Sequence, residues 1–153
     1  MRLARTLTVV AIAAVALIAL ACGGDDGGTG SGEANAGVRE IHLQMTDQIR
    51  FDPAEIQVEA GVPVRLVIDN SEAASIHDFS VKAIPVMDVN HEGEADMGHM
   101  GMNSTDDYDL HLALESGTDG VLEFTPTETG EYEFVCTVTG HAQAGMTGTL
   151  IVT

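Results

Sequence analysis

Alternation of apolar and polar side chains at every second residue dominates the sequence from residue 38 onward. In the clearest run, one face carries Val62, Val64, Leu66 and Ile68. Shorter runs of the same kind include Ile41-Leu43-Met45, Ile56-Val58 and Phe79-Val81. A period of two indicates strands with one buried face, and no helical period is sustained anywhere. The sequence pattern therefore predicts an all-β fold, a β-sandwich or barrel of about seven or eight strands.

The alternating run GEYEFVC ends on a cysteine that leads into a short loop. Tyr132, Phe134 and Cys136 share one face, so the Cys136 thiol is expected to point toward the core. Four residues separate Cys136 from His141, and four more separate His141 from Met146. The last strand, GTLIVT, begins two residues after Met146. A thiol, an imidazole and a thioether on one loop are all soft or borderline metal ligands.

This ligand set favours copper over zinc. Methionine is a poor zinc donor, and structural zinc needs three or four strong ligands. Two histidines and one cysteine with a weak axial methionine form a one-electron copper site. The second imidazole is predicted to come from His77, which follows the 62–68 run and precedes Phe79. A lone histidine is more often a surface or core residue, but His77 is expected at the same end of the sandwich as the loop.

The N-terminus predicts export. Residues 1–21 carry two arginines and then an apolar run from Leu7 to Ala21, which suits a signal peptide and is short for a membrane span of about 20 residues. A single membrane anchor remains the alternative. Ile18 to Cys22 resembles a bacterial lipobox, so Cys22 is predicted to be lipidated, with ordinary cleavage after Ala21 as the competing hypothesis. Residues 22–37 form a Gly/Asp-rich flexible tether, and the domain spans 38–153.

Export and charge together limit the partners. An exported chain with two cysteines would normally form a disulfide, but Cys22 lies at the processing site, which leaves Cys136 for a metal. All 24 acidic residues follow the signal, against four basic ones, so the mature chain carries a charge of about −20. Nucleic acid and anionic lipid need basic patches, and we exclude both. We expect basic partners and a monomer held at the extracytoplasmic face of the membrane by its lipid, or otherwise a soluble secreted or periplasmic protein.

Residues 87–120 lack the alternating pattern, apart from a short strand expected at Leu110 to Leu114. This acidic insertion is rich in Met and His, and its candidate second copper site consists of His91, Met97, His99, Met100 and Met102, near Met87. Thioethers and imidazoles bind Cu(I) well. The competing interpretation is an acidic insertion without a metal.

The sequence resembles the cupredoxins, or type 1 blue copper proteins, and most of all their rusticyanin and sulfocyanin branch. The resemblance rests on FDPAEIQVEAGVPVRLVIDN, on the SIHDF segment and on YEFVCTVTGHAQAGMTGTLIV, and covers 41–153 apart from the insertion. It implies a Greek-key fold that holds one copper through His77, Cys136 and His141, with Met146 axial. Two positions depart from the pattern: Thr139 replaces a common proline, and Asp78 replaces a common asparagine. The family's backbone N–H at that second position donates to the cysteine sulfur.

The resemblance implies a one-electron carrier rather than an enzyme, with redox proteins as partners and His141 as the electron exit. A thiol protease would place its cysteine and histidine on separate elements, a binuclear copper subunit needs two loop cysteines, and a c-type haem needs C-x-x-C-H. The remaining alternative is a copper-handling protein, a store, chaperone or sensor, that uses the Met/His-rich insertion.

Overall fold

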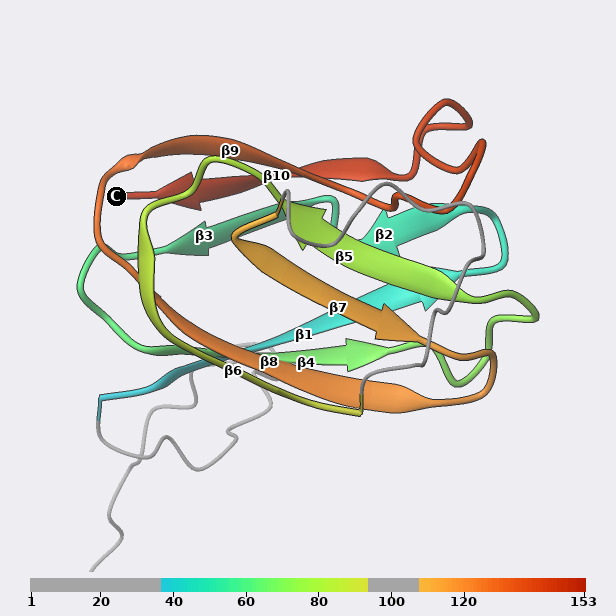
Figure 1. Cartoon of the computed structure of the whole chain (residues 1–153), viewed down its shortest axis with the longest axis horizontal. Coiled ribbons are helices and arrows are strands. Elements are labelled where there is room, and N and C mark those ends of the chain that lie inside the picture. Colours follow the sequence, from blue (N-terminus) through green and yellow to red (C-terminus); the bar gives the residue numbers. More distant parts are fainter. Residues whose placement is uncertain (1–36, 94–107) are drawn as a thin grey trace, which may run out of the picture. The chain divides into compact units, whose positions relative to one another are not determined.

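The computed structural model describes residues 37–93 and 108–153, and within these ranges the chain forms ten strands (Figure 1). In chain order they are β1 (Arg39–Thr46), β2 (Arg50–Asp52), β3 (Glu55–Val58), β4 (Val64–Asp69), β5 (His77–Val81), β6 (Val86–Glu92), β7 (Leu110–Leu114), β8 (Asp119–Pro126), β9 (Gly130–Val135) and β10 (Thr147–Val152). The predicted all-β sandwich is confirmed. No helix long and apolar enough to cross a membrane occurs in the described ranges.

Two five-stranded sheets make up the sandwich. One has the order β2-β1-β4-β8-β6 and the other β3-β10-β9-β5-β7. The β1–β4 and β3–β10 pairs are parallel, and the remaining pairs are antiparallel. Parallel neighbours cannot be joined by a tight hairpin. The chain therefore crosses between the sheets, and loops from distant parts of the sequence meet at the two ends.

The core is formed by the apolar faces of the alternating strands, as the sequence predicts. Leu43 and Met45 of β1 are buried, as are Leu66 and Ile68 of β4, each with polar or half-exposed neighbours between them. Three aromatic rings meet between the sheets: Phe134 lies 5.1 Å from Phe51 and 5.0 Å from Phe79, measured between ring centroids. Glycine is required at Gly148, because a Cβ there would lie 2.2 Å from the Phe134 ring.

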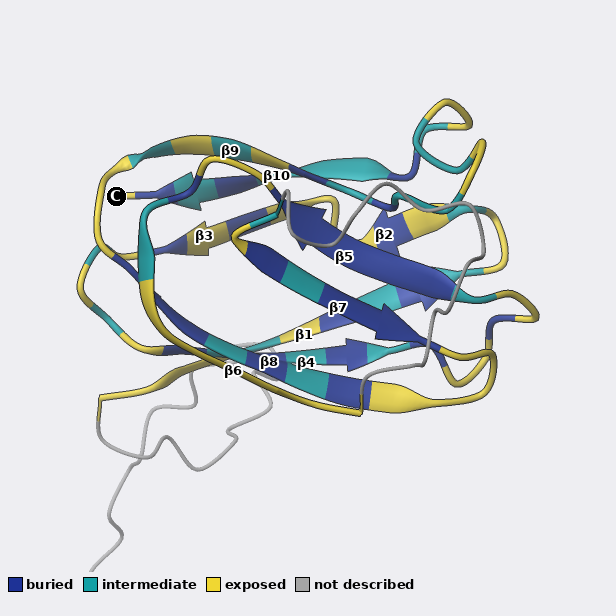
Figure 2. Cartoon of the chain, in the orientation of Figure 1, coloured by how far each residue is buried: buried dark blue, intermediate teal, exposed yellow. Residues whose placement is uncertain are grey.

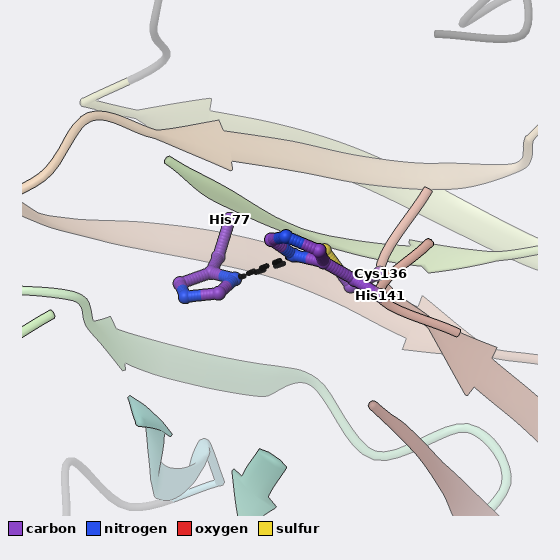
Figure 3. A group of neighbouring side chains, drawn as sticks. All are labelled: His77, Cys136 and His141. Carbon is purple, nitrogen blue, oxygen red and sulfur yellow. Dashed lines mark hydrogen bonds between the residues drawn. The ribbon is translucent and has the colours of Figure 1, made fainter. Parts of the chain in front are cut away.

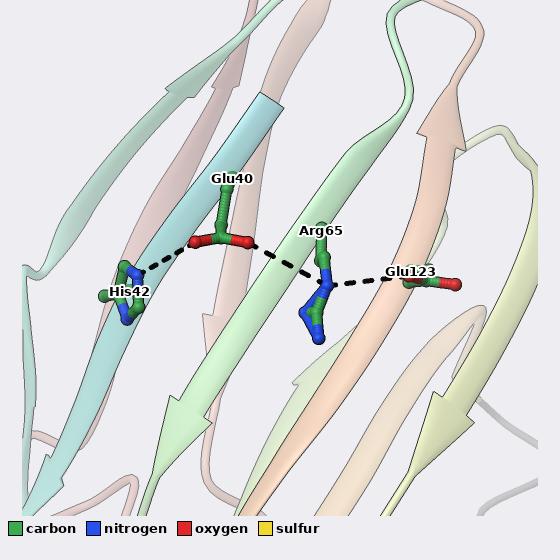
Figure 4. Close-up of polar contacts among 4 residues, drawn as sticks. All are labelled: Glu40, His42, Arg65 and Glu123. Atoms are coloured by element: carbon green, nitrogen blue, oxygen red, sulfur yellow. Dashed lines mark hydrogen bonds and ion pairs between the residues drawn. The ribbon is translucent and has the colours of Figure 1, made fainter. Parts of the chain in front are cut away.

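The outer face of the first sheet is solvated and charged (Figure 4). Arg65 on β4 lies between Glu40 on β1 and Glu123 on β8, with its Nε 3.9 Å from a carboxylate oxygen of each. His42 lies 3.3 Å from Glu40. Exposed pairs of this kind contribute little to stability. They do place one of the few basic side chains of an acidic protein between two carboxylates.

Two strands were not predicted. β2 has only three residues, and the cis Asp52–Pro53 bond separates it from β3. β6 begins one residue before the predicted insertion and runs into it, and it pairs with β8 across a register shift between Met87 and Asn90. Its side chains are nearly all exposed, so no apolar alternation marks it (Figure 2). β7 coincides with the short strand expected there.

The register of β5 places His77 at one end of the sandwich. β5 runs antiparallel to β9, with Ser80 opposite Val135 and Val81 opposite Phe134. His77 therefore lies beyond the end of β9, beside the loop that follows it. This is the end at which the sequence predicts a metal site.

Candidate metal centre

His77 begins β5, and the loop before it is tied down by a buried amide. Asn70 is fully buried, and its Nδ2 lies 3.0 Å from the carbonyl of Ser75, 3.1 Å from that of Leu114 and 2.9 Å from that of Glu115. These contacts fasten the loop to the end of β7. His77 itself is buried, and its Nε2 has no hydrogen-bond partner among the described residues.

The 136–146 loop is closed by backbone hydrogen bonds. The Cys136 N–H donates to the Met146 carbonyl at 3.0 Å, and the Met146 N–H donates to the His141 carbonyl at 2.9 Å. A third bond joins the His141 N–H to the Val138 carbonyl at 2.9 Å. Cys136 and Met146 are fully buried, whereas His141 is half-buried. The regular spacing seen in the sequence thus becomes a compact turn that returns Met146 to Cys136.

The structure brings His77, Cys136 and His141 together (Figure 3). The two histidine Nδ1 atoms are 3.1 Å apart, and the Cys136 Sγ lies 3.5 Å from Nδ1 of His141 and 3.9 Å from Nδ1 of His77. All three donor atoms lie within 4.8 Å of one another. One cation could contact all three of these donor atoms, so the geometry fits a bound metal.

The donor chemistry limits which metal fits. The three residues supply one thiolate and two imidazoles, with the buried Met146 anchored beside them by its own backbone. A closed structural zinc site would need a fourth strong ligand. Trigonal His₂Cys with a weak thioether suits copper. The residues present therefore fit a copper ion held by His77, Cys136 and His141.

Asp78 forms a buried network behind the cysteine. Its backbone N–H donates to the Cys136 Sγ at 3.5 Å, as the family resemblance implied. Its carboxylate accepts the Thr137 N–H at 2.6 Å, the Thr137 hydroxyl, and the Ser80 hydroxyl at 3.4 Å. Ser80 in turn contacts Nδ1 of His111 at 2.8 Å. Ser80, Thr137 and His111 were not predicted; the one signal in the sequence was a serine, Ser80, between the apolar residues Phe79 and Val81.

Burial disfavours charge on two of the three site residues, His77 and Cys136. It lowers the pKa of His77 to about 4, an effect strengthened by the charge of His141 and opposed by that of Asp47. Burial also raises the pKa of the Cys136 thiol to about 12, helped by the Asp78 carboxylate. The pKa of Asp78 is likewise raised by burial, against the hydrogen bonds from Thr137. A metal must therefore displace the thiol proton when it binds.

The other predicted residues lie elsewhere. Met87 and His91 are on the exposed strand β6. Outside the described residues are Cys22, Met97, His99, Met100 and Met102, together with the predicted signal peptide and most of the tether. The second copper site and the lipid anchor remain predictions.

A model of the cupredoxin-like domain matches residues 9–152 of the chain. The chain belongs to the cupredoxin-like family. It is similar to two proteins named copper-resistant cuproprotein CopI. The one from Rubrivivax gelatinosus is 29% identical over 79% of this chain and 70% of its own length, and the one from Pseudomonas aeruginosa is 31% identical over 74% and 76%.

Solved structures support the same cupredoxin-like fold. Auracyanin A of Chloroflexus aurantiacus, described as a blue copper protein, matches with a TM-score of 0.58 and 23% identity, over 76% of this chain and 100% of its own. Reduced auracyanin from Roseiflexus castenholzii matches with a TM-score of 0.57 and 20% identity, over 74% and 96%. The closer relation to rusticyanin and sulfocyanin stays a prediction.

The depressed pKa of His77 gives the metal-free cupredoxin domain a specific pH dependence. The unfolded chain takes up a proton on this imidazole near pH 6.5, but the folded protein does so only near pH 4. Stability contributed by neutral His77 is therefore present above pH 6.5 and is lost as the pH falls toward 4, by up to about 3 kcal/mol. We expect denaturant unfolding of the metal-free protein to show this loss.

Two variants isolate the effect. His77→Gln should lack this component of the pH dependence, whereas His42→Gln, at an exposed histidine, should retain it. Wild type and His77→Gln with the same pH dependence would contradict the assignment.

Proposed function

We propose that this cupredoxin is a type 1 copper protein that carries single electrons outside the cytoplasm. The observation behind the proposal is the convergence of His77, Cys136 and His141, which brings their donor atoms within 4.8 Å of one another at one end of the sandwich. Backbone and buried side-chain hydrogen bonds hold the segments that carry the three donors, so the donor set is organised before a metal arrives.

Each residue has a distinct role. His77, Cys136 and His141 would hold the metal, with Met146 as a weak fourth donor. Copper supplies one-electron chemistry through its Cu(I) and Cu(II) states. The Asp78 N–H, 3.5 Å from the Cys136 sulfur, stabilises negative charge on that sulfur. Because the β framework fixes these groups, little of the protein has to rearrange when the charge at the site changes.

His141 is the proposed exit for the electron. It is half-buried, whereas the other ligands are buried. The residues around it are small, namely Gly140, Ala142, Ala144 and Gly145. A partner can therefore approach the imidazole edge closely. Transfer of this kind needs no substrate pocket, so the proposal includes no enzymatic activity.

The charge of the domain favours basic redox partners. The four basic residues of the mature chain are outnumbered six to one by acidic ones. Complementary charge accelerates encounter between proteins more than it strengthens the complex. We propose transient docking of a basic partner on a monomeric carrier.

Colour tests the copper assignment. Wild-type protein loaded with Cu(II) should absorb intensely in the visible range, because the Cys136 thiolate donates charge to the metal. Cys136→Ser should abolish this band. Met146→Leu removes the buried thioether proposed as the axial donor. It should keep the visible band, because that donor is weak. A colourless copper-loaded wild type, or an unchanged band in Cys136→Ser, would overturn the assignment.

Copper handling is the second candidate function, and the similarity to the CopI proteins favours it. Their names associate both of them with copper resistance. In this chain Met87 and His91 lie on the exposed strand β6, which leads toward the Met/His-rich residues 97–102. A resistance protein could use these side chains to bind Cu(I) and pass it on.

Copper transfer and electron exchange separate the two functions. A carrier should exchange electrons rapidly with a reduced donor and keep its copper in the presence of a competing Cu(I) chelator. Replacing Met97, His99, Met100 and Met102 by serine should then leave the rate of electron exchange unchanged. Ready release of copper combined with slow electron exchange would favour the copper handler.

We also propose that the protein is exported and anchored by a lipid on Cys22. The support is the apolar run followed by a lipobox-like segment and a Gly-rich tether. Cys22→Ala should move the protein from the membrane fraction to the soluble fraction without changing the copper spectrum. A wild-type protein that is already soluble would instead support ordinary signal cleavage.

A further inference from the structure

The turn between β1 and β2 contacts both loops that carry the proposed ligands. The Asp47 carboxylate accepts a hydrogen bond from the Ala74 N–H at 2.6 Å, in the loop that leads into His77. At the other end of the turn, Nη1 of Arg50 donates to the Ala144 carbonyl at 2.5 Å. Ala144 lies between His141 and Met146. Two side chains three residues apart therefore reach two segments that are 70 residues apart in the sequence.

The turn itself is firmly held. Ile49 has a φ of 58°, which is uncommon for a β-branched residue. Its N–H donates to the Thr46 carbonyl at 2.9 Å, and its side chain packs against the core. Two residues further on, Phe51 is buried and pairs with Met45 across β1 and β2. Asp47 and Arg50 thus project from a support that the core fixes.

Arg50 fits closely against the copper loop. Its Nη1 also donates to the Ile49 carbonyl at 2.7 Å, so one nitrogen bridges the turn and the loop. A Cβ on Gly145 would lie 3.0 Å from this nitrogen and 3.1 Å from Cζ. Gly145 also has a φ of 98°, which favours glycine. The loop therefore has the one residue type that permits both its backbone conformation and the approach of the guanidinium.

Asp47 acts on the opposite ligand loop. The residues before His77 are held on one side by Asn70, through the Ser75 carbonyl, and on the other by Asp47, through the Ala74 N–H. The charge of Asp47 also acts on His77. The turn therefore places an anionic support on the His77 loop and a cationic support on the His141–Met146 loop.

We propose that Asp47 and Arg50 form a clamp that sets the position of His77 relative to His141 and Met146. They are positioning residues: both are exposed, and they act through the Ala74 N–H and the Ala144 carbonyl. This inference rests on the proposed copper function for its spectroscopic consequence, but the clamp itself is a property of the metal-free protein.

The first test is amide hydrogen exchange on the metal-free protein. Arg50→Gln should accelerate exchange at Gly145 and Met146 by about tenfold or more, and Asp47→Ala should do the same at Ala74. Asp47→Asn keeps an oxygen that can accept the bond and should remain close to wild type. Because both residues are exposed, circular dichroism should show an unchanged fold.

The second test compares the copper-loaded proteins. The controls are Arg39→Gln and Glu59→Gln, which make the same charge changes about 20 Å from the turn, where both residues line one pocket at the opposite end of β1. Visible spectrum and reduction potential should change in Arg50→Gln and Asp47→Ala, and much less in the controls. Arg50→Lys keeps the charge, so its spectrum should change if the guanidinium positions the loop.

The outcomes are distinct. Unchanged exchange in both Arg50→Gln and Asp47→Ala would overturn the clamp, as would equal spectral changes in the control variants. A wild type that forms no coloured copper complex would refute the proposed function instead, and the exchange experiment would still decide whether the clamp exists.

Discussion

The backbone hydrogen bond from Cys136 to the carbonyl of Met146 extends the β9–β10 pairing beyond the last paired strand residues and closes the loop between them. The bond matters because three of the four proposed ligands lie on this loop. A free loop of this length would pay a large conformational entropy on binding a metal. Here the strands and the closing hydrogen bonds already order the loop when the protein folds. The affinity for copper and the rigidity of the site therefore have the same origin.

Burial then determines the chemistry of the site. A buried thiol and a buried imidazole both disfavour charge, as the high pKa of Cys136 and the low pKa of His77 show. A cation between them reverses this balance, because it stabilises the thiolate and uses the imidazole lone pairs. Asp78 lies directly behind the sulfur with its carboxylate bonded to Thr137, so the position of the cysteine and the charge nearby are coupled.

Most of the framework was predictable from period-two patterns because one face of those strands is buried. The ligand loop was predictable because Cys136, His141 and Met146 are close in sequence. His77 was predictable because it follows the 62–68 run, which was expected to end at the same pole. β6 was not predicted, since its exposed side chains carry no alternation. Nor were the contacts of Asp47 and Arg50, which join side chains to the backbone of segments far away in the sequence and leave no local pattern.

The proposed copper site is preformed and should barely change between oxidation states. X-ray absorption at the copper edge of the wild-type protein, recorded oxidised and reduced, tests this most directly. We expect one short copper–sulfur and two copper–imidazole distances that are nearly the same in both states. A site without the short sulfur, or one whose ligand number changes on reduction, would contradict it.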